Sequence, residues 1–162
     1  MAGKWPARLV VRPVRETEAR VIARWRYSGP WRVYDLGPNA TTVNAANGYE
    51  AVADHSSDEL VGFCCSGEEA RVPGLRGEPD LVDVGLGMAP EWVGAGHGAE
   101  FGRVVVGHYR AMHPGVALRA AVQSWNKRSL RVTVRLGFVD RGHHECAQGG
   151  QDVRYSVMVL PG

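Results

Sequence analysis

Residues 92–101, WVGAGHGAEF, constrain the fold of this chain most, because three glycines at alternate positions precede an apolar segment. A glycine inside a helix costs about 1 kcal/mol relative to alanine. In a turn, a glycine permits positive φ and lets the backbone approach a ligand closely. We therefore predict that Gly94, Gly96 and Gly98 form a loop directly before a helix. The free N–H groups of such a loop, together with the dipole of the following helix, favour an anion such as a phosphate.

Hydrophobic periodicity places this loop in a chain that mixes strands and helices. We predict strands over 7–14, 49–55, 59–68, 81–88, 116–125 and 153–160, and helices over 16–26, 98–113 and 126–138. Residues 27–48 are turn-rich and 70–80 are loop-like. A helical crossover from strand 81–88 to strand 116–125 makes those two strands parallel. The glycine loop then follows the carboxyl end of a strand, where ligands bind in open α/β sheets.

Length and charge narrow the class of protein. The 162 residues contain no linker or repeat, so we expect a single domain over 1–162. The 19 basic and 17 acidic residues are dispersed, so the charge is compatible with small anionic ligands and neither demands nor excludes a nucleic-acid partner, whose binders usually cluster their basic residues. The sequence contains no apolar run of about 18 residues and no signal-peptide core, so we expect a cytoplasmic protein without a membrane span. We expect the protein to be a monomer or a homodimer.

The cysteines and histidines do not indicate a disulfide framework or a metal site. Cys64 and Cys65 lie in an apolar run and are predicted to be core residues of a strand. The tract HHEC, residues 143–146, lacks the ligand spacing of a structural zinc site. We predict that it is a solvated loop and that the protein holds no metal.

The glycine loop is neither a P-loop, since no GK[ST] follows, nor a dinucleotide fingerprint, since its last glycine comes too early. With its flanks, MAPEWVGAGHGAEF, it resembles the acyl-CoA pyrophosphate loop of the GNAT superfamily of N-acetyltransferases. A second segment, WNKRSLRVTVRLGF, resembles another motif of that family. The positions in register are Pro90, Gly94, Gly96 and Gly98 in the first motif, and Asn126, Ser129, Leu130, Val132, Leu136, Gly137 and Phe138 in the second.

The resemblance spans nearly the whole chain and implies an α/β (α+β) fold. A mixed, mostly antiparallel sheet of six to seven strands would be flanked by helices and splayed at its two central parallel strands. It also implies an acyltransferase that moves an acetyl group from acetyl-CoA to a primary amine of a small molecule by direct attack. The donor-binding residues that it implies are Leu86, Gly87, Met88, Val93, Gly94, Ala95, Gly96, His97, Gly98, Ala99, Asn126 and Ser129. The aromatic residues expected to shape the acceptor pocket are Trp25, Tyr27, Trp31 and Tyr34.

Three positions depart from the family pattern. Val93 and Ala95 stand where basic or amide side chains are usual, so two contacts to a pyrophosphate are missing. Thr133 stands where a tyrosine usually protonates the leaving thiolate, and threonine is a much poorer acid. Either the thiolate leaves unaided, or water, His108, Tyr109 or Tyr155 takes the place of the tyrosine. Asp83 is our candidate base for the attacking amine; the other carboxylates considered are Glu68, Glu69, Glu78 and Asp80.

These departures leave two further hypotheses. The same fold would suit a donor other than CoA, either an aminoacyl-tRNA or a carrier-protein thioester. RNA phosphates would then meet a dispersed set of arginines, namely Arg8, Arg12, Arg103, Arg110, Arg119, Arg128, Arg131 and Arg135. The third hypothesis is a degenerate GNAT domain that binds a ligand without catalysis.

Overall fold

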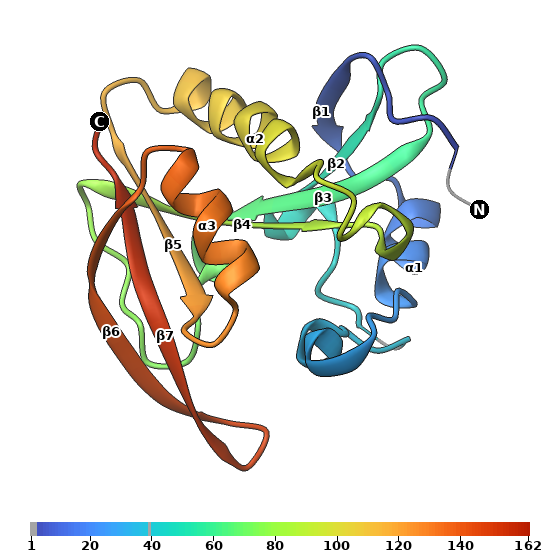
Figure 1. Ribbon diagram of the computed structural model, residues 1–162. Helices are drawn as coiled ribbons and strands as arrows, with labels where there is room; N and C mark the ends of the chain where they lie inside the picture. Colours follow the sequence, from blue (N-terminus) through green and yellow to red (C-terminus); the bar gives the residue numbers. More distant parts are fainter. Residues whose placement is uncertain (1–2, 39) are drawn as a thin grey trace. The chain divides into compact units, whose positions relative to one another are not determined.

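The computed structural model describes residues 3–38 and 40–162 (Figure 1). The predicted strands and helices occur in the expected order, together with an unpredicted strand, β6 (Val139–Gln148), and short 3₁₀ helices (η). In chain order the elements are β1 (Leu9–Pro13), α1 (Glu16–Ala23), η1 (Gly29–Tyr34), η2 (Ala45–Asn47), β2 (Tyr49–Asp54), β3 (Leu60–Ser66), η3 (Gly67–Ala70), β4 (Leu81–Met88), η4 (Pro90–Trp92), α2 (Gly98–Met112), β5 (Ala117–Gln123), α3 (Lys127–Arg135), β6 (Val139–Gln148) and β7 (Gln151–Leu160). None of the helices in the described ranges is long and apolar enough to cross a membrane.

The strands form a seven-stranded mixed sheet in the order β1-β2-β3-β4-β5-β7-β6. β4 and β5 run parallel, as the crossover predicted, whereas β1–β2, β5–β7 and β6–β7 are antiparallel. The parallel register joins Leu81–Asp83 to Ala117–Arg119, although β4 runs on to Met88 and β5 to Gln123. The predicted mixed sheet is confirmed.

Contacts divide the chain into two compact units, and each is built from separate stretches of sequence. The first unit contains Met1–Cys64 and Leu86–His97, and the second contains Cys65–Gly85 and Gly98–Gly162. Both β3 and β4 therefore begin in one unit and end in the other. A single domain over 1–162 stays a prediction.

The first unit has its core on β2 and α1. Ala51, Val52 and Ala53 of β2 and Ile22 of α1 are buried. α1 ends at Ala23, three residues before the predicted end, because the residues after it form hydrogen bonds outside the helix. The backbone N–H of Tyr27 donates to the Asp35 carboxylate at 2.9 Å instead of continuing the helix.

The second unit has its core where α2 meets β5 and β7. Phe101, Val105 and Tyr109 lie four residues apart on α2 and are buried, as an amphipathic helix predicts, together with Leu118 and Met158 on the strands. In Figure 1, α2 and α3 are the yellow and orange helices that follow β4 and β5 along the chain.

The prediction that residues 143–146 form a solvated loop is wrong, since they belong to the edge strand β6. An edge strand with one neighbour buries few side chains, so its sequence is polar and the hydrophobic pattern missed it. Gly149 and Gly150, both with positive φ, form the two-residue turn to β7. This Gly-Gly pair was the signal in the sequence for a hairpin.

The cysteine prediction is confirmed, since Cys64 and Cys65 are buried on β3. Burial raises the pKa of the Cys65 thiol to about 12, so it is an unreactive core residue. The Cys65 sulfur also explains Gly85 on β4, because a Cβ there would lie 3.2 Å from it.

Candidate active site

The glycine loop follows β4 after one turn of 3₁₀ helix. The backbone N–H of Val93 donates to Pro90 at 3.2 Å and closes that turn. Over the next four residues, Gly94 to His97, no backbone N–H donates to another group of residues 3–38 or 40–162. α2 begins directly afterwards, at Gly98, and the first N–H groups of a helix also lack intrahelical partners. The chain therefore carries a continuous run of unused backbone donors.

The three alternating glycines have two different causes. Gly94 and Gly96 have φ of +82° and +88°, a conformation that side chains strongly disfavour. Gly98 has an ordinary φ, but a Cβ there would lie 3.1 Å from Val132 of α3. The first two glycines shape the loop backbone, and the third lets α2 and α3 pack closely.

His97 is held by two tryptophans. Its ring stacks on Trp5 with a centroid distance of 4.1 Å and meets the edge of Trp92 at 5.9 Å. The two indoles contact each other edge-on at 5.2 Å. This stack anchors the end of the loop to the N-terminal segment, so His97 has a packing role. Sequence reasoning gave no role to Trp5, which lies 92 residues away from its partner.

The end of β4 is packed against aromatic residues of the same unit. A Cβ at Gly87 would lie 2.6 Å from the Phe63 ring, so only glycine fits beneath it. The Tyr27 hydroxyl donates to the Met88 carbonyl at 2.7 Å, and burial raises the pKa of Tyr27 to about 12. Leu86, in contrast, is 46% exposed.

Two of the four aromatic residues expected in the acceptor pocket lie near this strand end. Trp25 lies 6.2 Å from the Phe63 ring, and Tyr27 is bound to β4 as described. Trp31 and Tyr34 are half-buried on η1. The segment that follows α1 thus brings Trp25 to Phe63 of β3 and Tyr27 to Met88 of the neighbouring strand β4.

The second motif contains the whole of α3 and the residues on either side of it. The buried Asn126 caps the helix, because its Oδ1 accepts a hydrogen bond from the N–H of Ser129 at 3.2 Å. Thr133 is also buried, and its hydroxyl donates to the Ser129 carbonyl at 2.8 Å. The proton of the threonine that replaces the usual tyrosine is therefore already used within the helix.

Asp83 lies in a buried ion pair rather than in an open cleft. Its two oxygens accept hydrogen bonds from Nε and Nη2 of Arg119 at 2.6 and 3.1 Å, and both side chains are about 95% buried. Arg71 approaches the same carboxylate at 3.3 Å. Arg119 also binds the Arg76 carbonyl at 2.6 Å and Glu78 at 3.1 Å. The network ties the loop before β4 to β5, which favours a structural role for Asp83.

A chain of polar side chains near the end of β5 escaped the sequence reasoning. The indole N–H of Trp125 donates to Gln123 at 2.6 Å. The Gln123 amide donates to the Tyr155 hydroxyl at 3.4 Å, which donates to Gln148 at 2.5 Å. Burial raises the pKa of Tyr155. Of the other two acids considered, Tyr109 is fully buried and His108 contacts its ring.

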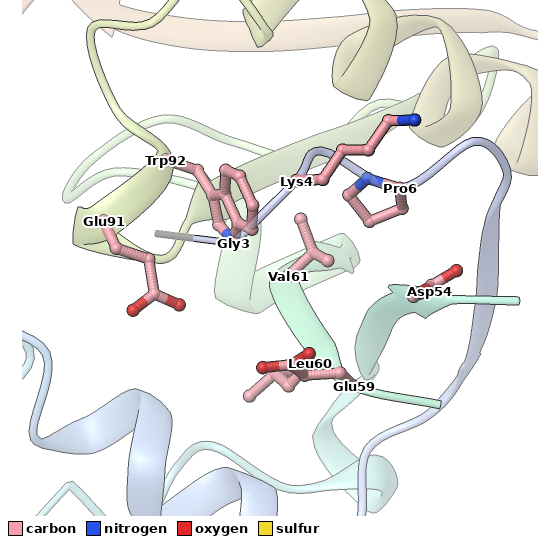
Figure 2. A pocket seen from close by; sticks show the side chains of 9 residues that line it. All are labelled: Gly3, Lys4, Pro6, Asp54, Glu59, Leu60, Val61, Glu91 and Trp92. Atoms are coloured by element: carbon pink, nitrogen blue, oxygen red, sulfur yellow. The ribbon is translucent and has the colours of Figure 1, made fainter. Parts of the chain in front are cut away.

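A separate hollow of about 180 Å³ lies in the first unit (Figure 2). It is lined by the N-terminal segment, the β2–β3 hairpin and η4, through Gly3, Lys4, Pro6, Asp54, Glu59, Leu60, Val61, Glu91 and Trp92. Figure 2 shows its acidic side chains spread around the hollow rather than converging on one point. None of the predicted donor or acceptor residues lines it.

The comparison with protein families decides between the classes of protein. The family model described as the acetyltransferase (GNAT) domain matches residues 8–139. The chain belongs to the GNAT acetyltransferase family. It is therefore an acyltransferase, and the family resemblance of its two motifs is confirmed. The sequence has no significant match among curated proteins.

Solved structures of the GNAT fold resemble the chain over nearly its full length. An acetyltransferase of the GNAT family from Bacillus anthracis is 15% identical with a TM-score of 0.68, covering 97% of this chain and 96% of the other. A spermidine N-acetyltransferase chimera of Vibrio cholerae SpeG and hSSAT is 14% identical with a TM-score of 0.70, covering 94% and 95%. The acetyltransferase yncA from Salmonella typhimurium, solved with acetyl-CoA, is 16% identical with a TM-score of 0.61, covering 94% and 93%. These matches support the GNAT fold.

Proposed function

We propose that this GNAT protein uses acetyl-CoA to acetylate a primary amine of a small molecule. The observation that carries the proposal is the run of unused backbone donors from Gly94 to His97, which leads directly into α2. Backbone N–H groups before a helix bind phosphates without basic side chains. The loop therefore suits the pyrophosphate of CoA even though Val93 and Ala95 supply no charge.

Acetyl-CoA would supply the activated thioester carbonyl, and the residues of this chain would hold and orient it. In the proposed arrangement the backbone of residues 94–99 binds the pyrophosphate and the exposed end of β4, Leu86–Met88, accompanies the pantetheine arm. The family resemblance also assigns Asn126 and Ser129, at the start of α3, to donor binding. Such positioning supplies much of the rate enhancement when one bound molecule attacks another.

Proton transfer is where this chain departs most from its family. The Thr133 hydroxyl is bound to the Ser129 carbonyl, so we propose that the leaving thiolate takes its proton from water. Asp83 would have to break its pair with Arg119 before accepting a proton. We therefore propose that Asp83 positions β4 and β5, and that water removes the proton of the acceptor amine.

The acceptor would bind beside the aromatic cluster on the first unit. Trp25 and Tyr27 are fixed on β3 and β4 by Phe63 and Met88, and Trp31 and Tyr34 follow on η1. An aromatic wall of this kind favours an amine with an apolar body. This supports a small-molecule acceptor.

A thermal-shift titration with acetyl-CoA tests the proposal. A specific ligand at a hundredfold excess over its Kd stabilises the folded state by about 2.7 kcal/mol. The variant Gly96→Ala should lose most of this response, because φ of +88° at position 96 strains any side chain. Gly107→Ala is the matched control, since position 107 lies on α2 with open space around it.

Two results would contradict the proposal. The first is no shift with millimolar acetyl-CoA while aminoacyl-tRNA or an acyl carrier protein gives a saturable shift. The second is saturable binding of acetyl-CoA without transfer to any amine in a broad panel, which would support the degenerate domain. An equal response of the Gly96→Ala and Gly107→Ala variants would remove the loop from the donor site.

A further inference from the structure

Helix α3 carries four basic side chains and no acidic one. Lys127, Arg131 and Arg135 are spaced four residues apart, so they lie along one face of the helix. Leu130 and Val134 lie beside them on the same face, because residues three and four apart are neighbours on a helix. We call these five residues the α3 stripe.

The two apolar residues of the α3 stripe face away from α2. Gly98 and Gly102 of α2 lie against Val132 and Leu136, where added Cβ atoms would be 3.1 and 2.6 Å from those side chains. Val132 and Val134 point about 200° apart around a helix of 3.6 residues per turn. Leu130 lies as far around the helix from Val132 as Val134 does, so the two apolar residues of the α3 stripe point away from the packed face of α3.

The cations of the α3 stripe have no ion-pair partner among the residues that the structure describes. Among residues 3–38 and 40–162, no carboxylate forms an ion pair with Lys127, Arg131 or Arg135. Some arginines elsewhere are paired, such as Arg12 with Glu18 and Asp58, and Arg119 with Asp83 and Glu78. Like charges four residues apart repel, and a cation in the first turn opposes the helix dipole. Arg135 lies in the last turn, where a cation suits the dipole, but helix stability does not explain Lys127 and Arg131.

The α3 stripe also exposes aliphatic surface. Val134 is 58% exposed, and a shallow hollow of about 540 Å³ is lined entirely by the α3 stripe. Surfaces that bind single-stranded nucleic acid combine cations with aromatic side chains on which bases stack. Here the cations flank leucine and valine, which suit the apolar ridge of another helix.

From this geometry we infer that the α3 stripe is a docking surface for an acidic amphipathic helix of a partner protein. Leu130 and Val134 would pack on the apolar ridge of that helix, and the three cations would meet its carboxylates. A second copy of this chain does not fit that description. Among the α-helices of the described residues, α1 has the most acidic residues, and it already pairs Glu16 with Arg20 and Glu18 with Arg12.

Fluorescence anisotropy with a synthetic helical peptide tests this inference. The probe carries leucines along one face, flanked on both sides by glutamates, and a scrambled peptide of the same composition is its control. We expect saturable binding that Arg131→Glu and Val134→Glu each weaken at least about tenfold, because charge complementarity and apolar contact both contribute. Arg8→Glu is the matched control, since Arg8 is an exposed arginine outside the α3 stripe. Circular dichroism confirms that the variants fold.

Four results would overturn the inference. One is that the scrambled peptide binds as tightly as the helical probe. Another is that Arg8→Glu weakens binding as much as Arg131→Glu does. Bulk tRNA would bind more tightly than the peptide and lose affinity with Arg131→Glu, which would make the surface a nucleic-acid site. Saturating acetyl-CoA would displace the peptide, which would assign the α3 stripe to donor binding.

Discussion

Replacing Asp83 with asparagine separates a structural role from a catalytic one. The change preserves the shape of the side chain but removes the charge that faces Arg119, and both groups are almost fully buried. Removing one partner of a buried ion pair typically costs about 3–5 kcal/mol. Glu78 still contacts Arg119 at 3.1 Å, but its side chain is 58% exposed, so it compensates little. For a chain of this size the loss corresponds to a fall in Tm of roughly 6–20 °C.

The double variant Asp83→Leu/Arg119→Met should recover at least half of that loss. Buried ion pairs replaced by apolar residues of similar volume are often neutral in stability. Recovery should be incomplete, because the Arg76 carbonyl loses its donor, which costs about 1–3 kcal/mol. Urea unfolding of the single and double variants measures this coupling, and Glu78→Gln serves as the exposed control, with an expected change below about 1 kcal/mol.

Activity of the folded double variant completes the test. The assay uses an acceptor identified in a panel of amines. The kcat/KM of the double variant should stay within about threefold of the wild-type value, whereas loss of a general base lowers the rate by about 10²–10⁴-fold. Our reasoning is refuted if Asp83→Asn unfolds like the wild type. It is also refuted if the double variant is stable but loses activity by the larger factor, which would restore Asp83 as the base.

Three further predictions follow from single contacts. Native protein should show one thiol that reacts readily with a thiol reagent, Cys146, and denatured protein all three, because the other two cysteines are buried; two reactive thiols in native protein would contradict this. Hydrogen bonds from Arg12 lower the pKa of Glu18 in the folded state, so its stabilisation is present at neutral pH and disappears as pH falls through the folded-state value. The Tm difference between wild type and Glu18→Gln should therefore shrink from about pH 5 to pH 3. A Tm difference that grows on acidification would contradict the lowered pKa of Glu18. Gly102→Ala should lower stability by about 1–3 kcal/mol, because its Cβ would lie 2.6 Å from Leu136; adding Leu136→Ala should relieve part of the overpacking, and no relief would place the cost elsewhere.

The sequence by itself determined most elements and the family. β4 and α2 follow the predicted ranges closely, because a buried strand and an amphipathic helix have strong local periodicities. The positive φ of Gly94 and Gly96 also follows from local chemistry, since few other residues adopt that conformation. β6 was missed because an edge strand carries a weak hydrophobic pattern.

Only the tertiary structure decided what individual side chains do. Asp83 meets Arg119, 36 positions away, and His97 stacks on Trp5, while Gly98 is small because α3 packs against it. Neither the spacing nor the composition of the sequence predicts these contacts, because they form only when folding brings distant segments of the chain together. Local patterns specify the backbone of a segment, whereas a carboxylate becomes a base or half of an ion pair according to the groups that folding places beside it.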